Sequence, residues 1–331
     1  MQIPTTGRPP APAPASEARW TKPARSRPAN QRALRRESGI ARIYVTGQLP
    51  SAITAALAAD FELADAPEGA DGILSLLTTA VDSVLLARAG PQLRIVANYA
   101  VGVNNIDLDA ARARGVVVAN TPDVLTRPTA ELAVTLMLSL LRRVTEGDRL
   151  IRRGEAWGFS LEFMLGETLD GKTVGIVGPG RIGTETARLV EAFGARPISA
   201  GRNDDLFALL EAADVVSLHC PLTHETHHLI GTAELEAMKA SAVLVNTARG
   251  PVVDEQALVA ALRRGAIAGA ALDVYEDEPR VSDELLAMEN VVLSPHLGSA
   301  TRPTREAMGM LAVEALRAVL LRGETPPNLV R

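Results

Sequence analysis

The chain has 331 residues, of which 47% are hydrophobic and 22% charged, a composition typical of a globular protein with core enough for two domains. Residues 1–39 hold eight Lys or Arg against two Glu, a balance of +6, so with a net charge of −5 the remaining chain carries −11, which argues against a nucleic-acid-binding surface on the folded body. Apolar runs well short of the roughly 18 residues of a spanning helix argue against a membrane segment, and a single cysteine, Cys220, favours a reducing, cytoplasmic setting.

Residues 1–39 mix Pro, Ala, Arg and Ser without apolar periodicity, and we predict a disordered basic extension there. From Ile40 onward, apolar strand patterns alternate with a helical pattern in the manner of a parallel sheet. The predicted strands are 41–46, 72–77, 94–98 and 116–118, and the helix is 51–59. Val101 and Gly102 follow the third strand, and their N–H groups can hold a substrate carboxylate, although a plain strand-to-helix turn explains the same residues.

Residues 129–143 predict a long helix with a broad apolar face, which indicates burial between domains or against a second subunit. Trp157, Phe159 and Phe163 follow in a segment without periodicity, where large apolar side chains are costly unless they are covered. We therefore expect a homodimer.

Residues 173–202 carry the most specific pattern in the chain. A short apolar strand runs directly into Gly178, Gly180 and Gly183 at G-x-G-x-x-G spacing, and an amphipathic helix follows. The first glycine permits a tight turn, the second lets the backbone approach a pyrophosphate, and the third lets helix pack on strand. Free N–H groups at the helix N-terminus favour an anion, so we predict a dinucleotide site rather than a glycine turn without ligand.

The end of the next strand distinguishes NADP(H) from NAD(H). An NAD site usually has an Asp or Glu there to bind the ribose hydroxyls, whereas this chain has Gly201, Arg202 and Asn203. A guanidinium can bind a 2′-phosphate in a bidentate manner, which favours NADP(H). NAD(H) stays possible if Asp204 or Asp205 folds back onto the ribose.

Six strands are predicted from Val174 onward, enough for a doubly wound sheet, and residues 302–321 predict a closing helix. Arg249, Glu278 and His296 each follow one of these strands, so all three are expected at one edge of the sheet beside the dinucleotide. A His can donate a proton to a carbonyl, a Glu can orient the imidazole, and an Arg can bind a carboxylate and polarise the carbonyl. These groups suit hydride transfer to a carbonyl.

The segment from His224 to His228 satisfies H-E-x-x-H, a zinc-binding pattern when it lies on a helix. Here Pro221 precedes it and Gly231 follows closely, which leaves scarcely one helical turn. We predict a polar loop near the cofactor and no metal site.

Six passages resemble the D-isomer-specific 2-hydroxyacid dehydrogenases, and the resemblance covers nearly all of residues 40–331. They are N-Y-A-V-G-V-N-N-I-D, N-T-P-D-V-L-T, V-G-I-V-G-P-G-R-I-G, V-N-T-A-R-G-P-V-V-D, A-L-D-V-Y-E-D-E-P and S-P-H-L-G-S-A-T. Within the family the chain is most similar to glyoxylate and hydroxypyruvate reductases. The resemblance implies NADPH-dependent reduction of such small 2-oxo acids. The family also includes corepressors, so a dinucleotide-sensing binding protein is the alternative.

The resemblance also implies roles for single residues. Arg249 matches the substrate-binding arginine, His296 the acid/base histidine and Glu278 its carboxylate partner. Leu77, Val101 and Gly102 match substrate contacts, and Asp273 matches the residue that holds the nicotinamide carboxamide. The other expected cofactor contacts are Gly178, Gly180, Arg181, Ile182, Gly183, Gly201, Arg202, Asn203, Pro221, Thr247 and Ala248.

The family fold implies two α/β domains with doubly wound parallel sheets. A Rossmann coenzyme domain at 121–301 is inserted in a flavodoxin-like substrate domain formed by 40–120 and 302–331. One departure is the short link between Arg202 and Val215, where relatives usually carry an additional strand or turn.

Overall fold

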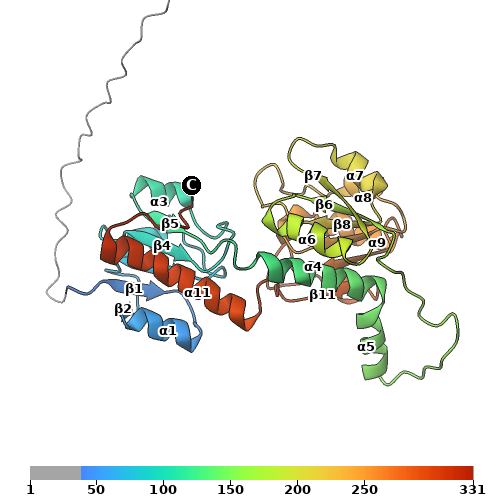
Figure 1. The fold of residues 1–331 in the computed structure, drawn as a ribbon, viewed down its shortest axis with the longest axis horizontal. Helices are drawn as coiled ribbons and strands as arrows, with labels where there is room; N and C mark the ends of the chain where they lie inside the picture. Colours follow the sequence, from blue (N-terminus) through green and yellow to red (C-terminus); the bar gives the residue numbers. More distant parts are fainter. Residues whose placement is uncertain (1–38, 331) are drawn as a thin grey trace, which may run out of the picture. The chain divides into compact units, whose positions relative to one another are not determined.

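The computed structural model describes residues 39–330, which form two parallel β-sheets covered by helices (Figure 1). Apart from Gly39, the predicted basic extension at residues 1–39 lies outside the described residues. Within 39–330, no helix combines the length and the apolar character needed to span a bilayer.

The first sheet has five parallel strands in the order β2-β1-β3-β4-β5, which is the flavodoxin-like order. Its strands are β1 (Arg42–Val45), β2 (Glu62–Ala64), β3 (Gly72–Ser75), β4 (Ile95–Asn98) and β5 (Val117–Ala119), and its connecting helices are α1 (Ser51–Ala58), α2 (Ser83–Ala89) and α3 (Leu108–Ala113). Asp82 and Asp107 start α2 and α3, because each side chain accepts a backbone N–H of the first turn. Strand β2 was missed by the sequence analysis, since its three residues lie at a sheet edge and are not buried.

Helix α4 (Thr126–Leu141) begins three residues before the predicted helix. Its apolar face packs against its own chain, since Ala133, Leu136 and Met137 are buried in one core with strands of the second sheet. The expectation that this face needs a second domain or subunit was therefore wrong. Helix α5 (Val144–Arg152) was also missed; it follows a break at Arg143, whose φ of 54° is left-handed.

The second sheet contains the six parallel strands that the sequence predicted, in the order β11-β10-β9-β8-β6-β7. They are β6 (Thr173–Val177), β7 (Arg196–Ala200), β8 (Val215–Leu218), β9 (Val243–Asn246), β10 (Gly269–Leu272) and β11 (Val291–Leu293). Strand β6 pairs with β7 on one side and β8 on the other, so the chain reverses its winding there. Ligands of such sheets bind at the carboxyl ends of the strands at this switch point.

Helices cover both faces of the second sheet. They are α6 (Arg181–Glu191), α7 (Leu206–Ala212), α8 (Thr232–Ala237), α9 (Glu255–Arg263) and α10 (Asp283–Leu286), and a 3₁₀ turn, η1 (Gly250–Val252), precedes α9. The short link after β7 holds α7 and no strand, so β7 is an edge strand. This agrees with the truncated link noted in the sequence.

The closing helix α11 (Arg302–Arg317) continues into a π-helical turn, η2 (Ala318–Arg322). Its buried side chains, among them Met308, Val313 and Leu316, share a core with α1 and the first sheet. Figure 1 shows α11 in red beside β4 and α1. The last helix of the described chain thus packs against its first strands and helix. The predicted doubly wound fold class is confirmed.

Candidate active site

The glycine turn between β6 and α6 has the close contacts that the motif predicts. Gly178 has a φ of 89°, and a Cβ atom there would lie 2.6 Å from the backbone nitrogen of Cys220. A Cβ atom on Gly183 would lie 2.4 Å from the carbonyl oxygen of Gly178, whereas Gly180 faces open space. Only glycine fits the first and third positions, and the second leaves the N-terminus of α6 accessible to a phosphate.

The next residues of the turn have different contacts. The Nε atom of Arg181 lies 2.7 Å from a carboxylate oxygen of Asp123, both side chains being exposed. Asp123 belongs to the T-P-D-V-L-T passage and has a left-handed φ of 70°. Ile182, the second residue of α6, lines the large cavity described below. The ion pair between Arg181 and Asp123 therefore joins the start of α6 to the segment that precedes α4.

The end of β7 presents an exposed Arg202 that has no ion pair with any residue of 39–330. Asp204 accepts the backbone N–H of Gly201 at 2.7 Å, and Asp205 accepts that of Ala208 at the start of α7. Both carboxylates are thus engaged by the backbone of their own loop. A hydrogen bond from Thr223, and to a smaller extent the charge of Arg202, hold the pKa of Glu225 below its ordinary value.

A cavity of ≈1210 Å³ opens at the carboxyl ends of strands from both sheets. A volume of this size is that of a ligand site rather than of a packing defect. Eleven of the predicted site residues line it: Leu77, Val101, Gly102, Ile182, Pro221, Thr247, Ala248, Arg249, Asp273, Glu278 and His296. The other seven lie outside its lining, at the glycine turn and the end of β7: Gly178, Gly180, Arg181, Gly183, Gly201, Arg202 and Asn203.

The imidazole of His296 and the carboxylate of Glu278 form a hydrogen-bonded pair. Nδ1 of His296 lies 2.8 Å from Oε2 of Glu278, and the other carboxylate oxygen accepts the backbone N–H of Tyr275 at 3.1 Å. Burial raises the pKa of Glu278, but the bond to His296, the Tyr275 amide and the charge of Arg249 together hold it below its ordinary value. Because the charged carboxylate is hydrogen-bonded to Nδ1, Nε2 is the ring nitrogen that is available for proton transfer. Nε2 has no hydrogen-bond partner among residues 39–330.

Arg249 extends from the turn after β9 toward Gly102. Its Nη1 donates to the carbonyl oxygen of Ala248 at 2.7 Å, and a Cβ atom on Gly102 would lie only 2.0 Å from Nη2. Burial lowers the pKa of Arg249, while the nearby charge of Glu278 raises it. The absence of a side chain at Gly102 therefore lets a guanidinium lie against the backbone amides that follow β4.

Asp273 anchors the turn that carries His296. Its two carboxylate oxygens accept the backbone N–H groups of Leu297 at 2.7 Å and Gly298 at 2.8 Å, and Ser294 donates its hydroxyl to the same carboxylate. Burial raises the pKa of Asp273 against these bonds, which lower it. The Asp273 side chain lines the cavity, but its hydrogen bonds indicate that its main role is to hold the loop 294–298 in place.

Two asparagines that the sequence analysis missed hold the turns of the site. Asn98 donates to the carbonyl oxygen of Gly102 at 2.8 Å, and Asn246 donates to that of Arg249 at 2.9 Å. Both are buried, and each is the last residue of an apolar strand. The signal in the sequence was an asparagine as the last residue of an apolar strand, because a buried amide side chain there must find hydrogen-bond partners on the backbone.

The H-E-x-x-H segment is not helical. Residues 224–228 form turns, and His228 has a left-handed φ of 53°. Its Nε2 lies 2.7 Å from Oε1 of Glu276, and its ring stacks on that of His227. Within residues 39–330, no group of three or more His, Cys, Asp or Glu side chains has the arrangement of a metal site.

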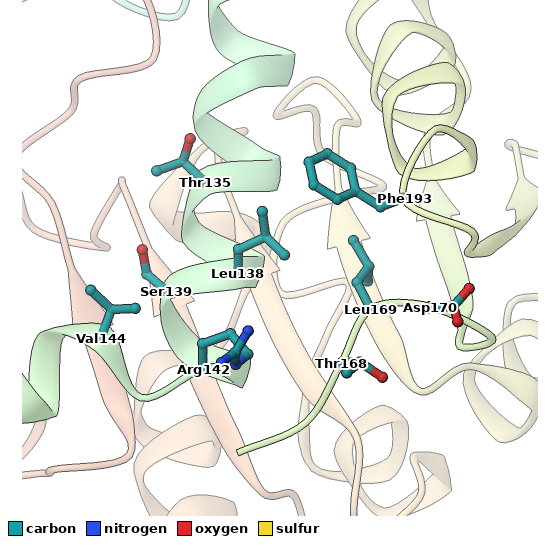
Figure 2. A pocket seen from close by; sticks show the side chains of 9 residues that line it. All are labelled: Thr135, Leu138, Ser139, Arg142, Val144, Thr168, Leu169, Asp170 and Phe193. Atoms are coloured by element: carbon teal, nitrogen blue, oxygen red, sulfur yellow. The ribbon is translucent and has the colours of Figure 1, made fainter. Parts of the chain in front are cut away.

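A second cavity, of ≈640 Å³, lies beside the carboxyl-terminal half of α4. Figure 2 shows Leu138, Leu169 and Phe193 around it, with Arg142 and Asp170 as its only charged side chains. None of the predicted site residues lines this cavity. It therefore offers no acid/base pair comparable to the one formed by Glu278 and His296.

Comparison with known proteins agrees with this geometry. The sequence model of "D-isomer specific 2-hydroxyacid dehydrogenase, NAD binding domain" matches residues 134–298. A glyoxylate reductase from Thermococcus litoralis is 47% identical over 278 residues, which cover 78% of this chain and 83% of the relative. A crystal structure of a Thermus thermophilus protein superposes with a TM-score of 0.81 at 42% identity, covering 88% of this chain and all of the other. A Sinorhizobium meliloti NADPH-dependent glyoxylate/hydroxypyruvate reductase, solved with NADP and malonate, gives a TM-score of 0.79 at 36% identity, covering 88% and 96%.

Proposed function

Because this chain belongs to the D-isomer specific 2-hydroxyacid dehydrogenase family, an NAD(P)-dependent class of oxidoreductases, we propose that it reduces glyoxylate and hydroxypyruvate with NADPH. One observation carries the proposal: the His296–Glu278 pair and the guanidinium of Arg249 line one cavity next to Gly102. The glyoxylate reductases among the relatives support the choice of a short 2-oxo acid.

The glycine turn fits a dinucleotide, since Gly180 leaves the α6 N-terminus open and Gly178 and Gly183 bring strand and helix close together. When bound, the dinucleotide supplies the hydride. In our proposal, Val101, Gly102 and Arg249 hold the substrate carboxylate. His296 donates the proton on Nε2 to the carbonyl oxygen, and Glu278 accepts the Nδ1–H bond, which fixes the imidazole and favours its charged form.

Two substitutions test these roles. We expect His296→Gln to lower kcat by orders of magnitude with NADPH binding retained, because the proton donor is lost and the fold is not. Arg249→Ala is expected mainly to raise KM for glyoxylate, because it removes the carboxylate anchor. Wild-type-like turnover in His296→Gln contradicts the assignment. A dinucleotide-sensing binding protein would instead show negligible turnover of every 2-oxo acid in the wild type.

We propose a preference for NADPH over NADH, supported by the exposed guanidinium of Arg202, which has no ion pair within 39–330, and by the engagement of Asp204 and Asp205 with their own backbone. The measurement is KM for both cofactors in wild type, Arg202→Ala and, as a matched control, Arg264→Ala, an exposed arginine at the end of α9 away from the cavity. We expect Arg202→Ala to raise KM for NADPH about tenfold or more and to leave that for NADH nearly unchanged. An NADH preference in the wild type refutes the proposal.

We propose a homodimer whose interface includes the segment after α5. Trp157, Phe159 and Leu161 are 60%, 88% and 85% exposed, and Trp157 stacks on Phe163 with ring centroids 6.3 Å apart. A run of exposed large apolar side chains is typical of an interface, and an identical subunit is the simplest partner. Light scattering after size exclusion should give a dimer for wild type and a monomer for Phe159→Ser with Leu161→Ser; a wild-type monomer contradicts this.

The division into domains and the compartment are also proposals. We propose a substrate domain from 40–120 and 302–331 around a Rossmann domain at 121–301, supported by the separate cores of the two sheets and by the packing of α11 on α1. A cytoplasmic location is supported by Cys220, the single cysteine, which is buried and unpaired.

A further inference from the structure

Arg305 lies on α11 and lines the same cavity as Arg249, but the sequence analysis gave it no role. The residue is partly buried, and its guanidinium makes no hydrogen bond or ion pair with another residue of 39–330. Arg317, at the other end of α11, shows the usual alternative, since it pairs with Asp60 at 2.6 Å. A guanidinium has five N–H donors, and leaving them without partners at a partly buried site is unfavourable unless a ligand or water accepts them.

Tyr99 fixes the place of Arg305 relative to the substrate amides. Its hydroxyl donates to the backbone carbonyl of Arg305, and Gly309 makes room for it, because a Cβ atom there would lie 2.7 Å from that hydroxyl. Tyr99 and Arg305 both line the cavity, where burial raises the pKa of the Tyr99 phenol and the charge of Arg305 lowers it. Tyr99 precedes Gly102 by three residues, and both residues line the cavity. Gly102, Arg249 and Arg305 thus line one cavity from three places in the fold, the turns after β4 and β9 and the helix α11.

The other charged groups of the cavity are already engaged. Glu278 is bound to His296, and Asp273 is bound to the backbone of 297–298, so neither neutralises Arg305. Arg249 lies against Gly102 on the side assigned to the substrate carboxylate. The cavity thus has a second cation, on a different element, that pairs with no side chain of residues 39–330, and a substrate with only a carboxylate and a carbonyl leaves it without an acceptor.

We propose that Arg305 is a specificity-determining residue that binds an oxygen acceptor on C3 of the substrate. The preferred substrates are then 2-oxo acids with a C3 hydroxyl or a second carboxylate, rather than those with a plain alkyl group. This inference rests on the proposed function, since it takes Arg249 as the anchor of the first carboxylate. It adds a reason for discrimination, because a site built to bind a hydroxyl rejects the analogue that lacks it.

The test compares hydroxypyruvate with pyruvate, which differ only in the C3 hydroxyl. We expect kcat/KM in the wild type to favour hydroxypyruvate, and Arg305→Met to reduce the ratio of the two values roughly tenfold to a hundredfold, the range for a hydrogen bond to a charged group. The different intrinsic reactivity of the two carbonyls is the same in both enzymes, so it cancels. Arg305→Lys should keep part of the preference, because an ammonium still donates.

Arg302→Met is the matched control, since Arg302 is exposed, lies one turn earlier on α11 and does not line the cavity. Its ratio is expected to equal that of wild type. An unchanged ratio in Arg305→Met overturns the inference, and so does an equal loss on both substrates, which indicates a general structural role. If the wild type reduces neither substrate with NADPH or NADH, the proposed function itself fails; if it reduces both and the ratio is insensitive to Arg305, only this inference fails.

Discussion

Replacing Gly102 by Ala separates the placement of Arg249 from the stability of the fold. The new methyl carbon would lie 2.0 Å from Nη2 and 2.9 Å from Cζ of Arg249, where ordinary contacts begin at 3.4 Å. The guanidinium must therefore withdraw by roughly 1 Å or more. Only the end of a flexible side chain has to move, and Gly102 does not have a left-handed φ, so we expect Tm to change by less than about 2 °C.

Activity is expected to respond far more strongly than stability. A displacement of about 1 Å in a group that positions the substrate costs on the order of a hundredfold in rate. We expect kcat/KM for glyoxylate to fall by about that factor, mainly through KM, while the affinity for NADPH, measured by fluorescence titration, stays near that of wild type.

The control for this substitution is Gly147→Ala in α5, where the new carbon would have Met164 Cε at 3.7 Å as its nearest neighbour. It should leave the kinetics unchanged. A Gly102→Ala enzyme with the KM of wild type would show that the guanidinium of Arg249 does not lie against this backbone during turnover. A large loss of Tm would show instead that the packing around Gly102, and not the substrate site, is sensitive to the added carbon.

Three further substitutions have defined outcomes. Gly250→Ala should lower the free energy of unfolding by about 3 kcal/mol or more, measured by urea denaturation, because the new carbon would lie 1.8 Å from the backbone oxygen of Tyr275, which cannot move aside; a smaller loss contradicts this. Burial lowers the pKa of His219 to about 4, so the unfolded chain binds more protons than the folded chain between pH 4 and 6.5. Wild type should therefore lose about 2 kcal/mol of its free energy of unfolding from pH 8 to pH 5, and His219→Asn should not show this loss. The pKa of Glu278 is lowered, so its stabilising bond to His296 should be present above pH 4.5 and lost as pH falls further; the Tm difference between wild type and Glu278→Gln should therefore shrink in acid, and a constant difference refutes it.

Much of the fold was predictable because it depends on local patterns. Apolar strands of three to five residues and glycines at fixed spacing are read from neighbouring residues, and all six strands of the second sheet were found this way. The elements that were missed lack such a signal. Strand β2 is not buried, and α5 is separated from α4 only by Arg142 and the left-handed Arg143, a break that no glycine or proline marks. The apolar face of α4 was recognised, but periodicity does not say which surface covers it.

The sequence by itself determined the fold class and the dinucleotide turn, because both depend on residue type at short spacing, and its resemblance to a known family supplied the roles of Leu77, Asp273 and other candidate site residues. The tertiary structure decided which of those residues meet. It alone places the guanidinium of Arg249 against Gly102, uses the carboxylate of Asp273 to hold the His296 turn, and leaves Arg305 without a partner among residues 39–330 in the same cavity. These contacts join residues that lie far apart along the chain, and the physical reason is that sheet order and helix packing bring them together through long-range contacts that no local pattern encodes.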